Sequence, residues 1–149
     1  MTDSPIWQPF TQMKTADAPL KVVRAQGAML ELSDGRRIID AISSWWVTLH
    51  GHSHPVLAQA ISEQAQTLEH VIFAGFTHEP AEQLAHLLCA HSPAGLQRVF
   101  FSDNGSTAVE VALKMAYQYW QRRGQPQRSR FIGFVGGYHG DTLGAMTVG

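Results

Sequence analysis

The sequence predicts an α/β fold with a mainly parallel sheet, preceded by a small antiparallel segment. Residues 96–101 and 130–135 are short apolar runs typical of buried strands, and a long helical pattern over 106–123 separates them. A strand, a helix and a second strand form a crossover unit, whose strands run parallel with helices on the faces of the sheet. An Asp-Gly pair at 34–35, between two strand-like runs, adds an antiparallel hairpin near the N-terminus.

The antiparallel segment is expected over residues 21–40. Residues 21–24 and 28–32 are the first two short strands, residues 33–36 supply the Asp-Gly turn, and residues 37–40 return as a third strand. The sequence therefore predicts a small sheet that forms from local connections.

Three helices are expected after this sheet. Pro55 suits the first position of a helix that runs to about Leu68, and Pro80 opens a second helix that runs to about Ala90. The third helix, 106–123, ends before Gly124, which suits the left-handed residue that often closes a helix. These helices and the runs at 96–101 and 130–135 follow each other as in a sheet with covering helices.

Composition limits the classes of function. The 149 residues carry a net charge of −1, 44% hydrophobic and 15% charged residues, and no basic stripe, so binding to nucleic acid is not expected. No apolar run reaches the length of a membrane span, no signal segment opens the chain, and the single Cys89 lies in an apolar run. We expect a cytoplasmic protein. Because helix signals continue up to Gly149, we also expect that the chain is a fragment.

The segment after the first run of the predicted crossover is a candidate phosphate site. Asp103-Asn104-Gly105-Ser106-Thr107 places backbone N–H groups and hydroxyls at a helix N-terminus, where anions bind. The alternative is that Ser106 or Asn104 only caps the helix. Neither a P-loop lysine nor the glycine spacing of a dinucleotide fingerprint is present, which disfavours nucleoside triphosphates and NAD.

The second run ends in a glycine-rich loop, residues 136–142, with Tyr138 at its centre. An aromatic face over a phosphate-anchored ring suits a pyridine cofactor, while the alternative is a tyrosine packed in a turn. His139 is open between a ring contact, a proton relay and a structural histidine. Both loops lie where strands of an open α/β sheet hand over to helices, the usual position of a ligand crevice.

Six segments together resemble class III pyridoxal 5'-phosphate (PLP) dependent aminotransferases: Trp7-Gln8-Pro9-Phe10-Thr11-Gln12-Met13, Ser33-Asp34-Gly35, Ser43-Ser44-Trp45-Trp46, His50-Gly51-His52-Ser53-His54-Pro55, Ser102-Asp103-Asn104-Gly105-Ser106 and Gly137-Tyr138-His139-Gly140-Asp141-Thr142. The resemblance implies fold type I, with residues 1–50 in the small domain and 51–149 opening the PLP-binding large domain. It also implies a homodimer. The early Trp-x-Pro-Phe motif and the double tryptophan narrow the resemblance to the family members that act in biotin biosynthesis.

The resemblance also implies roles for individual residues. Gly105 and Ser106 match residues that hold the cofactor phosphate, and Tyr138 matches an aromatic that stacks on the pyridine and lines the substrate site. Trp45 matches a substrate-contacting tryptophan, with Trp46 beside it. Phe10 departs from members that carry a substrate-contacting tyrosine there, because phenylalanine has no hydroxyl.

The implied activity is transfer of an amino group to 8-amino-7-oxononanoate, giving 7,8-diaminononanoate. The expected donor is S-adenosyl-L-methionine, with lysine as the alternative that Phe10 leaves open. Lys14, Lys21 and Lys114 do not match the family's Schiff-base lysine, which we expect downstream of Gly149 together with the pyridine-pairing aspartate; Lys114 is expected to pair with Glu110 instead. The chain alone is therefore expected to be inactive.

Three other functions stay open. The chain can belong to another class III ω-amino acid aminotransferase with a different substrate. His50, His52 and His54 would present three imidazoles on one face if they formed a strand, which would make a metal site, although Gly51 and Pro55 favour a loop. A non-enzymatic interaction domain with an aminotransferase-like sequence is the third alternative.

Overall fold

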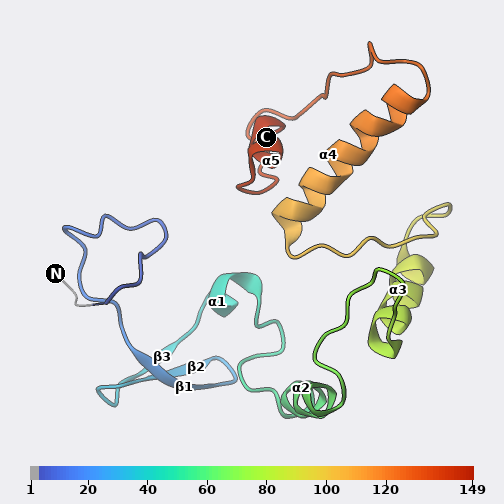
Figure 1. Ribbon diagram of the computed structural model, residues 1–149. Helices are drawn as coiled ribbons and strands as arrows, with labels where there is room; N and C mark the ends of the chain where they lie inside the picture. The colour runs from blue at the N-terminus through green and yellow to red at the C-terminus, as the bar shows by residue number, and fades with distance from the viewer. Residues whose placement is uncertain (1–3) are drawn as a thin grey trace. The chain divides into compact units, whose positions relative to one another are not determined.

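A computed structural model describes residues 4–149, which divide into two compact units, one ending at Ala74 and the other spanning Gly75–Gly149 (Figure 1). Each unit is described by itself. The division follows the contacts within residues 4–149 and does not test membership of a small or a large domain. The expected assignment of residues 1–50 and 51–149 to those domains therefore stays a prediction.

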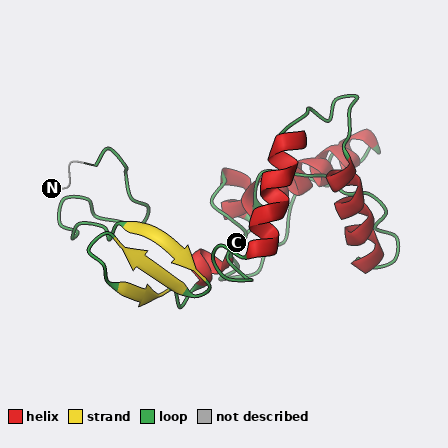
Figure 2. Ribbon diagram, turned by 90° about the horizontal axis from the view of Figure 1, so that it is seen from below, coloured by secondary structure: helices red, strands yellow, loops and turns green. Residues whose placement is uncertain are grey.

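The first unit contains the antiparallel sheet that the sequence predicts. Strands β1 (Val22–Gln26), β2 (Met29–Leu32) and β3 (Arg37–Ile39) pair in the order β1-β2-β3, drawn yellow in Figure 2. Local hydrogen bonds close the turn between β2 and β3. The Asp34 carboxylate accepts from the backbone N–H and the Nε of Arg36, at 3.0 and 2.8 Å, and Gly35 adopts φ 85°. These bonds hold the pKa of Asp34 below its ordinary value.

Helix α2 (Pro55–Thr67) begins at the proline that the sequence marks, and the loop before it docks on the sheet. Gly27 and His52 exchange two backbone hydrogen bonds, N–H to O at 3.0 and 2.8 Å, as an isolated antiparallel bridge. Gly51 makes this approach possible, because a Cβ at that position would lie 2.9 Å from the Cα of Gly27. The loop is thereby fixed against the turn between β1 and β2.

A short turn of left-handed helix, which the sequence did not reveal, lies between β3 and α2. Residues Ser43–Trp46, labelled α1, all have positive φ, from 46° to 69°. The backbone N–H of Trp46 donates to Ile42 O and that of Val47 to Ser43 O, both at 2.9 Å. Left-handed backbone costs on the order of 1–2 kcal/mol for each L-residue with a Cβ. Four such residues in succession must therefore be held by their surroundings.

The second unit consists of helices α3 (Glu79–His91), α4 (Gly105–Arg122) and α5 (Leu143–Thr147), of which α4 and α5 pack together. Pro80 lies in the first turn of α3, and Gly124 follows α4 with φ 70°. The predicted helices are thus confirmed within one or two residues at each end. Helix α5 was not predicted.

Residues 96–101 and 130–135 are not paired as strands. Among residues 4–149, the structure assigns strands only to the antiparallel sheet of the first unit. A strand is defined by hydrogen bonds to a neighbour, and neither run finds one among the described residues. The two strands that the sequence predicts are therefore not formed among the described residues.

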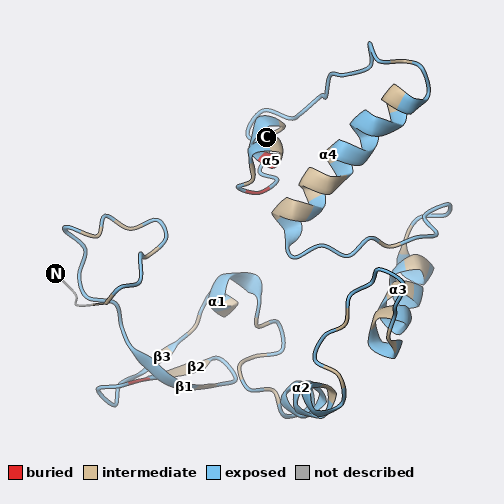
Figure 3. Ribbon diagram, viewed as in Figure 1, coloured by how far each residue is buried: buried red, intermediate tan, exposed pale blue. Residues whose placement is uncertain are grey.

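Little of the described chain is buried. Leu32 and Ala145, at 2% and 0% exposure, are the fully buried apolar residues that the structure records among residues 4–149 (Figure 3). Many aromatic and aliphatic side chains remain exposed in both units, including Trp46, Val56, Met115, Tyr119 and Phe134. No helix in residues 4–149 combines the length and apolar character that a membrane crossing requires.

We expect the isolated 149-residue chain to associate in solution, because exposed apolar surface of this extent is covered in stable monomers. Sedimentation velocity over a range of protein concentrations measures this directly, and species larger than a monomer should grow with concentration. A compact monomer that unfolds cooperatively would contradict the expectation.

Candidate functional site

The N-terminus of α4 carries a capping box that leaves two amide groups available. The Asn104 side chain accepts from Thr107 N at 2.9 Å, and Thr107 Oγ1 accepts from Asn104 N at 3.1 Å. Asn104 is therefore the cap, as the capping alternative anticipated for this residue or Ser106. The N–H groups of Gly105 and Ser106 have no partner inside the helix, since the first-turn amides of any helix lack one. They add to the positive end of the helix dipole.

The glycine-rich loop 136–142 lies against this N-terminus. Thr142 N donates to Ser106 Oγ at 2.9 Å, and Ser106 Oγ donates to Thr142 Oγ1 at 2.9 Å. Gly140 makes the approach possible, because a Cβ there would lie 2.3 Å from the Cβ of Ser106. The two loops that the sequence marked as candidate sites thus meet around one hydroxyl group.

Glu110 fastens the same contact from one turn further along α4. Its Oε2 accepts from Thr142 Oγ1 at 2.8 Å and from Ala145 N at 3.2 Å. A Cβ on Gly144 would lie 2.5 Å from this carboxyl group, so the glycine leaves it room. Sequence reasoning missed Glu110 and Thr142 as parts of the site. The signal that could have found Glu110 is its four-residue spacing from Ser106, which places both residues on one helix face.

Tyr138 presents an open ring at the edge of this loop. Its side chain is largely exposed, and its hydroxyl donates to Asp141 Oδ2 at 3.2 Å. This hydrogen bond to a carboxylate raises the pKa of Tyr138. Most of the ring surface stays open, as stacking on a ligand requires. The side chain of the neighbouring His139 lies beside Gly137, whose Cβ would be 3.0 Å from its Nε2.

Of the four residues expected at the substrate site, Tyr138 belongs to the second unit, and the other three form an aromatic cluster in the first unit: Phe10, Trp45 and Trp46. The rings of Phe10 and Trp45 stack with centroids 5.7 Å apart and planes 11° from parallel, and Trp46 meets Trp45 edge-on at 5.9 Å. All three are more than half exposed. Phe10 also has a positive φ of 51°. The structure thus brings together three of the four expected residues, although the stacking of Phe10 on Trp45 was not foreseen.

The three histidines at 50, 52 and 54 do not converge. His52 Nε2 contacts Asp40 Oδ2 at 2.8 Å, whereas the rings of His50 and His54 meet edge-on with centroids 6.0 Å apart. No group of three or more side chains suited to holding a metal occurs within residues 4–149. The histidines form a loop leading into α2, as Gly51 and Pro55 indicated.

The expected pair of Lys114 and Glu110 is wrong. The ion pairs of the described residues are Arg36–Asp34 and His52–Asp40, and Glu110 binds the start of α5 instead. Two hydrogen bonds from the chain itself satisfy this carboxyl group better than one mobile surface ammonium. Lys14, Lys21 and Lys114 are all exposed, so none lies in an enclosed site.

Comparisons with known proteins agree with one another. Residues 11–149 match the family described as aminotransferase class-III. The adenosylmethionine-8-amino-7-oxononanoate aminotransferase of Synechococcus elongatus is 66% identical over 144 residues, 97% of this chain and 34% of the relative. The enzyme of the same name from Mycobacterium leprae is 50% identical over 149 residues, covering 96% of this chain and 34% of the relative.

Solved structures give the same result. The crystal structure of adenosylmethionine-8-amino-7-oxononanoate aminotransferase from Methanocaldococcus jannaschii matches with a TM-score of 0.91 and 42% identity, over 97% of this chain and 33% of that one. An amine transaminase from an uncultivated Pseudomonas species in the PLP-bound form matches with a TM-score of 0.84 and 34% identity, over 99% and 34%. The fold is that of a segment of a fold type I transferase. The chain spans about a third of the length of these relatives, and it belongs to the class III aminotransferase family.

Proposed function

We propose that this chain is the N-terminal part of a PLP-dependent transaminase that converts 8-amino-7-oxononanoate into 7,8-diaminononanoate in biotin biosynthesis. The observation that carries the proposal is the meeting of Ser106 with loop 136–142, in a chain 66% identical to a relative that bears this enzyme's name. The proposed amino donor is S-adenosyl-L-methionine, as the names of the relatives indicate. Lysine stays the alternative, because Phe10 offers no hydroxyl to a donor.

The residues at the start of α4 fit the phosphate of PLP. Gly105 and Ser106 offer two N–H groups at the positive end of an 18-residue helix, with open space around Gly105, and no acidic residue lies in the first turn. Tyr138 is close in sequence to Gly140, which touches Ser106, and would stack on the pyridine ring. When bound, PLP supplies an aldehyde that carries the amino group and a ring that withdraws electrons. The Ser106 hydroxyl must turn away from Thr142 Oγ1 to donate to the phosphate.

The aromatic cluster of Phe10, Trp45 and Trp46 suits the substrate. Its stacked faces can cover the methylene chain of 8-amino-7-oxononanoate, which is long and apolar between polar ends. In this proposal the chain's residues bind and orient the ketone, while a lysine outside these 149 residues moves the proton. The enzyme acts as a homodimer in the cytoplasm, and the exposed apolar side chains supply surface for assembly.

A second candidate is a transaminase with another ω-amino substrate. Omega-transaminases from Thermomicrobium roseum and Pseudomonas jessenii match this chain with TM-scores of 0.88 and 0.87, at 30% and 29% identity. Assays of the full-length enzyme with 8-amino-7-oxononanoate, using S-adenosyl-L-methionine or lysine as donor, separate the candidates. Turnover of simple ω-amines without turnover of 8-amino-7-oxononanoate would favour the second.

The isolated chain should show no transaminase activity and should carry no covalent cofactor, because the proposed nucleophile is not among its lysines. Borohydride reduction in the presence of PLP, followed by mass spectrometry, measures this. A stoichiometric pyridoxyl adduct on Lys14, Lys21 or Lys114 would contradict the proposal.

In the full-length enzyme, Ser106→Ala should weaken PLP binding about tenfold to a hundredfold, since one charge-assisted hydrogen bond is worth roughly 1.5–3 kcal/mol. Tyr138→Phe should leave PLP affinity near normal, because the ring face remains, and should impair turnover of the ketone if the hydroxyl orients it. Dissociation constants from absorbance or fluorescence titration, with steady-state kinetics, measure both.

Thr142→Ala is the matched control for Ser106→Ala. It removes the hydroxyl that binds Ser106 and Glu110 but keeps the Ser106 hydroxyl available to a phosphate. PLP affinity should therefore fall less than in Ser106→Ala. Unchanged affinity in Ser106→Ala would remove the phosphate assignment, and equal losses in both variants would assign Ser106 to loop packing alone.

A further inference from the structure

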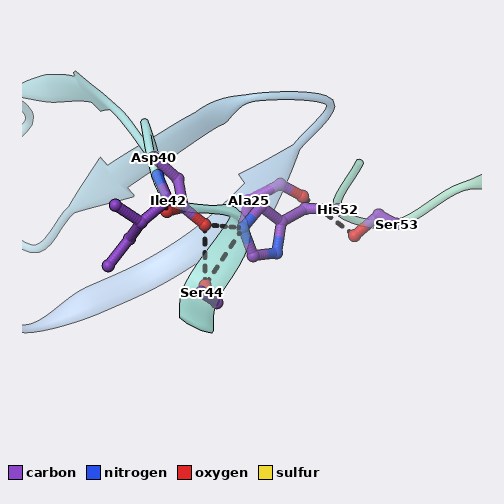
Figure 4. Close-up of polar contacts among 6 residues, drawn as sticks. All are labelled: Ala25, Asp40, Ile42, Ser44, His52 and Ser53. Atoms are coloured by element: carbon purple, nitrogen blue, oxygen red, sulfur yellow. Dashed lines mark hydrogen bonds and ion pairs between the residues drawn. The ribbon is translucent and has the colours of Figure 1, made fainter. Parts of the chain in front are cut away.

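The left-handed turn that carries Trp45 and Trp46 is tied down by a polar cluster that no predicted role accounts for. Figure 4 shows Asp40, Ser44 and His52 joined by dashed contacts, with Ser53 bound to the backbone of Ala25 nearby. The backbone of the turn forms three hydrogen bonds, from the N–H groups of Trp46, Val47 and Thr48, and a right-handed turn would offer bonds of the same kind. Its side-chain contacts are therefore the main candidates for what keeps it in this conformation.

Asp40 is the centre of the cluster. Its Oδ2 accepts from Ser44 Oγ at 2.7 Å and contacts His52 Nε2 at 2.8 Å, while Ser44 Oγ and His52 Nε2 lie 3.5 Å apart. The backbone N–H and hydroxyl of Ser44, followed by the His52 imidazole, hold the pKa of Asp40 well below its usual range. The side chain thus stays an acceptor for both partners at neutral pH.

Both sides of the cluster are anchored to the sheet. Asp40 directly follows β3, and its backbone N–H donates to Ala28 O at 2.8 Å. His52 is fixed through its two backbone hydrogen bonds with Gly27. The side chains of Asp40 and His52 are 6% and 17% exposed, which shields their contact from solvent. Asp40, which binds the hydroxyl of Ser44 in the second position of the turn, is therefore itself held by the sheet.

The backbone conformation of Ser44 affects the position of the tryptophans, because they follow it directly in the chain. Ser44 has φ 46° and ψ 54°, and Trp45 follows with φ 69° and ψ 44°. If Ser44 relaxed to negative φ, the chain direction at Trp45 would change and its ring would leave Phe10. The orientation of the aromatic cluster thus depends on a conformation that L-residues avoid.

We propose that Asp40 and His52 are positioning residues, which hold Ser44 in left-handed backbone and so aim the faces of Trp45 and Trp46 at the substrate. The proposal rests on the proposed function, in which these tryptophans contact the ketone. It adds a source of specificity outside the residues that touch substrate, because the hydrogen bonds of the Asp40 carboxylate set the orientation of the aromatic cluster.

Ser44 offers a direct test, because two substitutions remove the same hydroxyl with opposite effects on strain. Ser44→Ala loses the bond to Asp40 and keeps a Cβ in left-handed backbone. Ser44→Gly loses the same bond, but glycine adopts positive φ without a steric penalty. At a position with negative φ, glycine would be no better than alanine.

In the full-length enzyme loaded with PLP, Ser44→Ala and Asp40→Asn should raise KM for 8-amino-7-oxononanoate roughly tenfold, the effect of about one lost hydrogen bond. The dissociation constant of PLP should change less than about twofold, since the phosphate site lies elsewhere in the chain. Ser44→Gly should recover most of the loss. Asp40→Asn should then have a smaller effect in the Ser44→Gly background than alone, because there is less strain to hold.

Asp34→Asn is the matched control, since the Asp34 carboxylate also accepts a backbone and a side-chain hydrogen bond in this unit but does so at the exposed turn between β2 and β3. It should leave KM unchanged. A KM in Ser44→Ala or Asp40→Asn equal to that of the control, or a Ser44→Gly variant as impaired as Ser44→Ala, would overturn the proposal. So would a parallel loss of PLP affinity, which would indicate a general structural role.

A readout independent of turnover separates this proposal from the proposed function. Trp45 and Trp46 can be labelled with 5-fluorotryptophan, and their ¹⁹F resonances followed in the PLP-loaded enzyme without substrate. Ser44→Ala should shift both resonances and Ser44→Gly should restore them, whichever ketone the enzyme uses. Unmoved resonances in Ser44→Ala would overturn the positioning role of Asp40 and His52. Failure to turn over 8-amino-7-oxononanoate in the unaltered enzyme would overturn only the proposed function.

Discussion

The hydrogen bonds of one carboxyl group, that of Glu110, hold the second unit's candidate site together. Through Thr142 Oγ1 and Ala145 N, Glu110 ties the start of α5 to α4, and this contact keeps loop 136–142 beside Ser106. Apolar burial contributes little here, since Ala145 is the fully buried residue that the structure records in this unit. A few directional bonds with small residues at their sides therefore define the geometry.

The first unit uses the same device. Asp40 links the end of β3 to the left-handed turn and to the loop before α2, as Glu110 links α4 to α5. In both units a carboxyl oxygen accepts from a hydroxyl and from a second donor, and glycines permit the close approach of backbone: Gly51 in one unit, Gly140 and Gly144 in the other. Such networks specify position more narrowly than apolar packing, because hydrogen bonds weaken steeply with angle and distance.

Local signals predicted the local elements. Pro55, Pro80, the Asp34-Gly35 turn and Gly124 each act through the conformation of one or two residues, so the sheet and three helices were predictable. The clustering of Ser106 with loop 136–142 was predictable as well, from the rule that such loops share one edge of a sheet. The pairing of residues 96–101 and 130–135 was not, because it depends on which segments lie alongside.

The sequence also concealed features that arise from contacts between distant positions. Nothing in Ser43-Ser44-Trp45-Trp46 indicates left-handed backbone, since these residue types avoid it when isolated. The contact of His52 with Asp40 spans twelve positions and appeared in the sequence only as one member of a histidine triplet. The role of Glu110 was obscured by a plausible local partner, Lys114, that the structure does not use.

The hand of the turn at 43–46 also limits which residues can replace its tryptophans. Trp45 and Trp46 occupy backbone that β-branched residues adopt only as outliers, so valine, isoleucine and threonine are poor replacements. Glycine, asparagine and aspartate tolerate this backbone best. Natural or laboratory evolution of these two positions is thus restricted by the chirality of L-amino acids, before the contacts of the new side chains are selected.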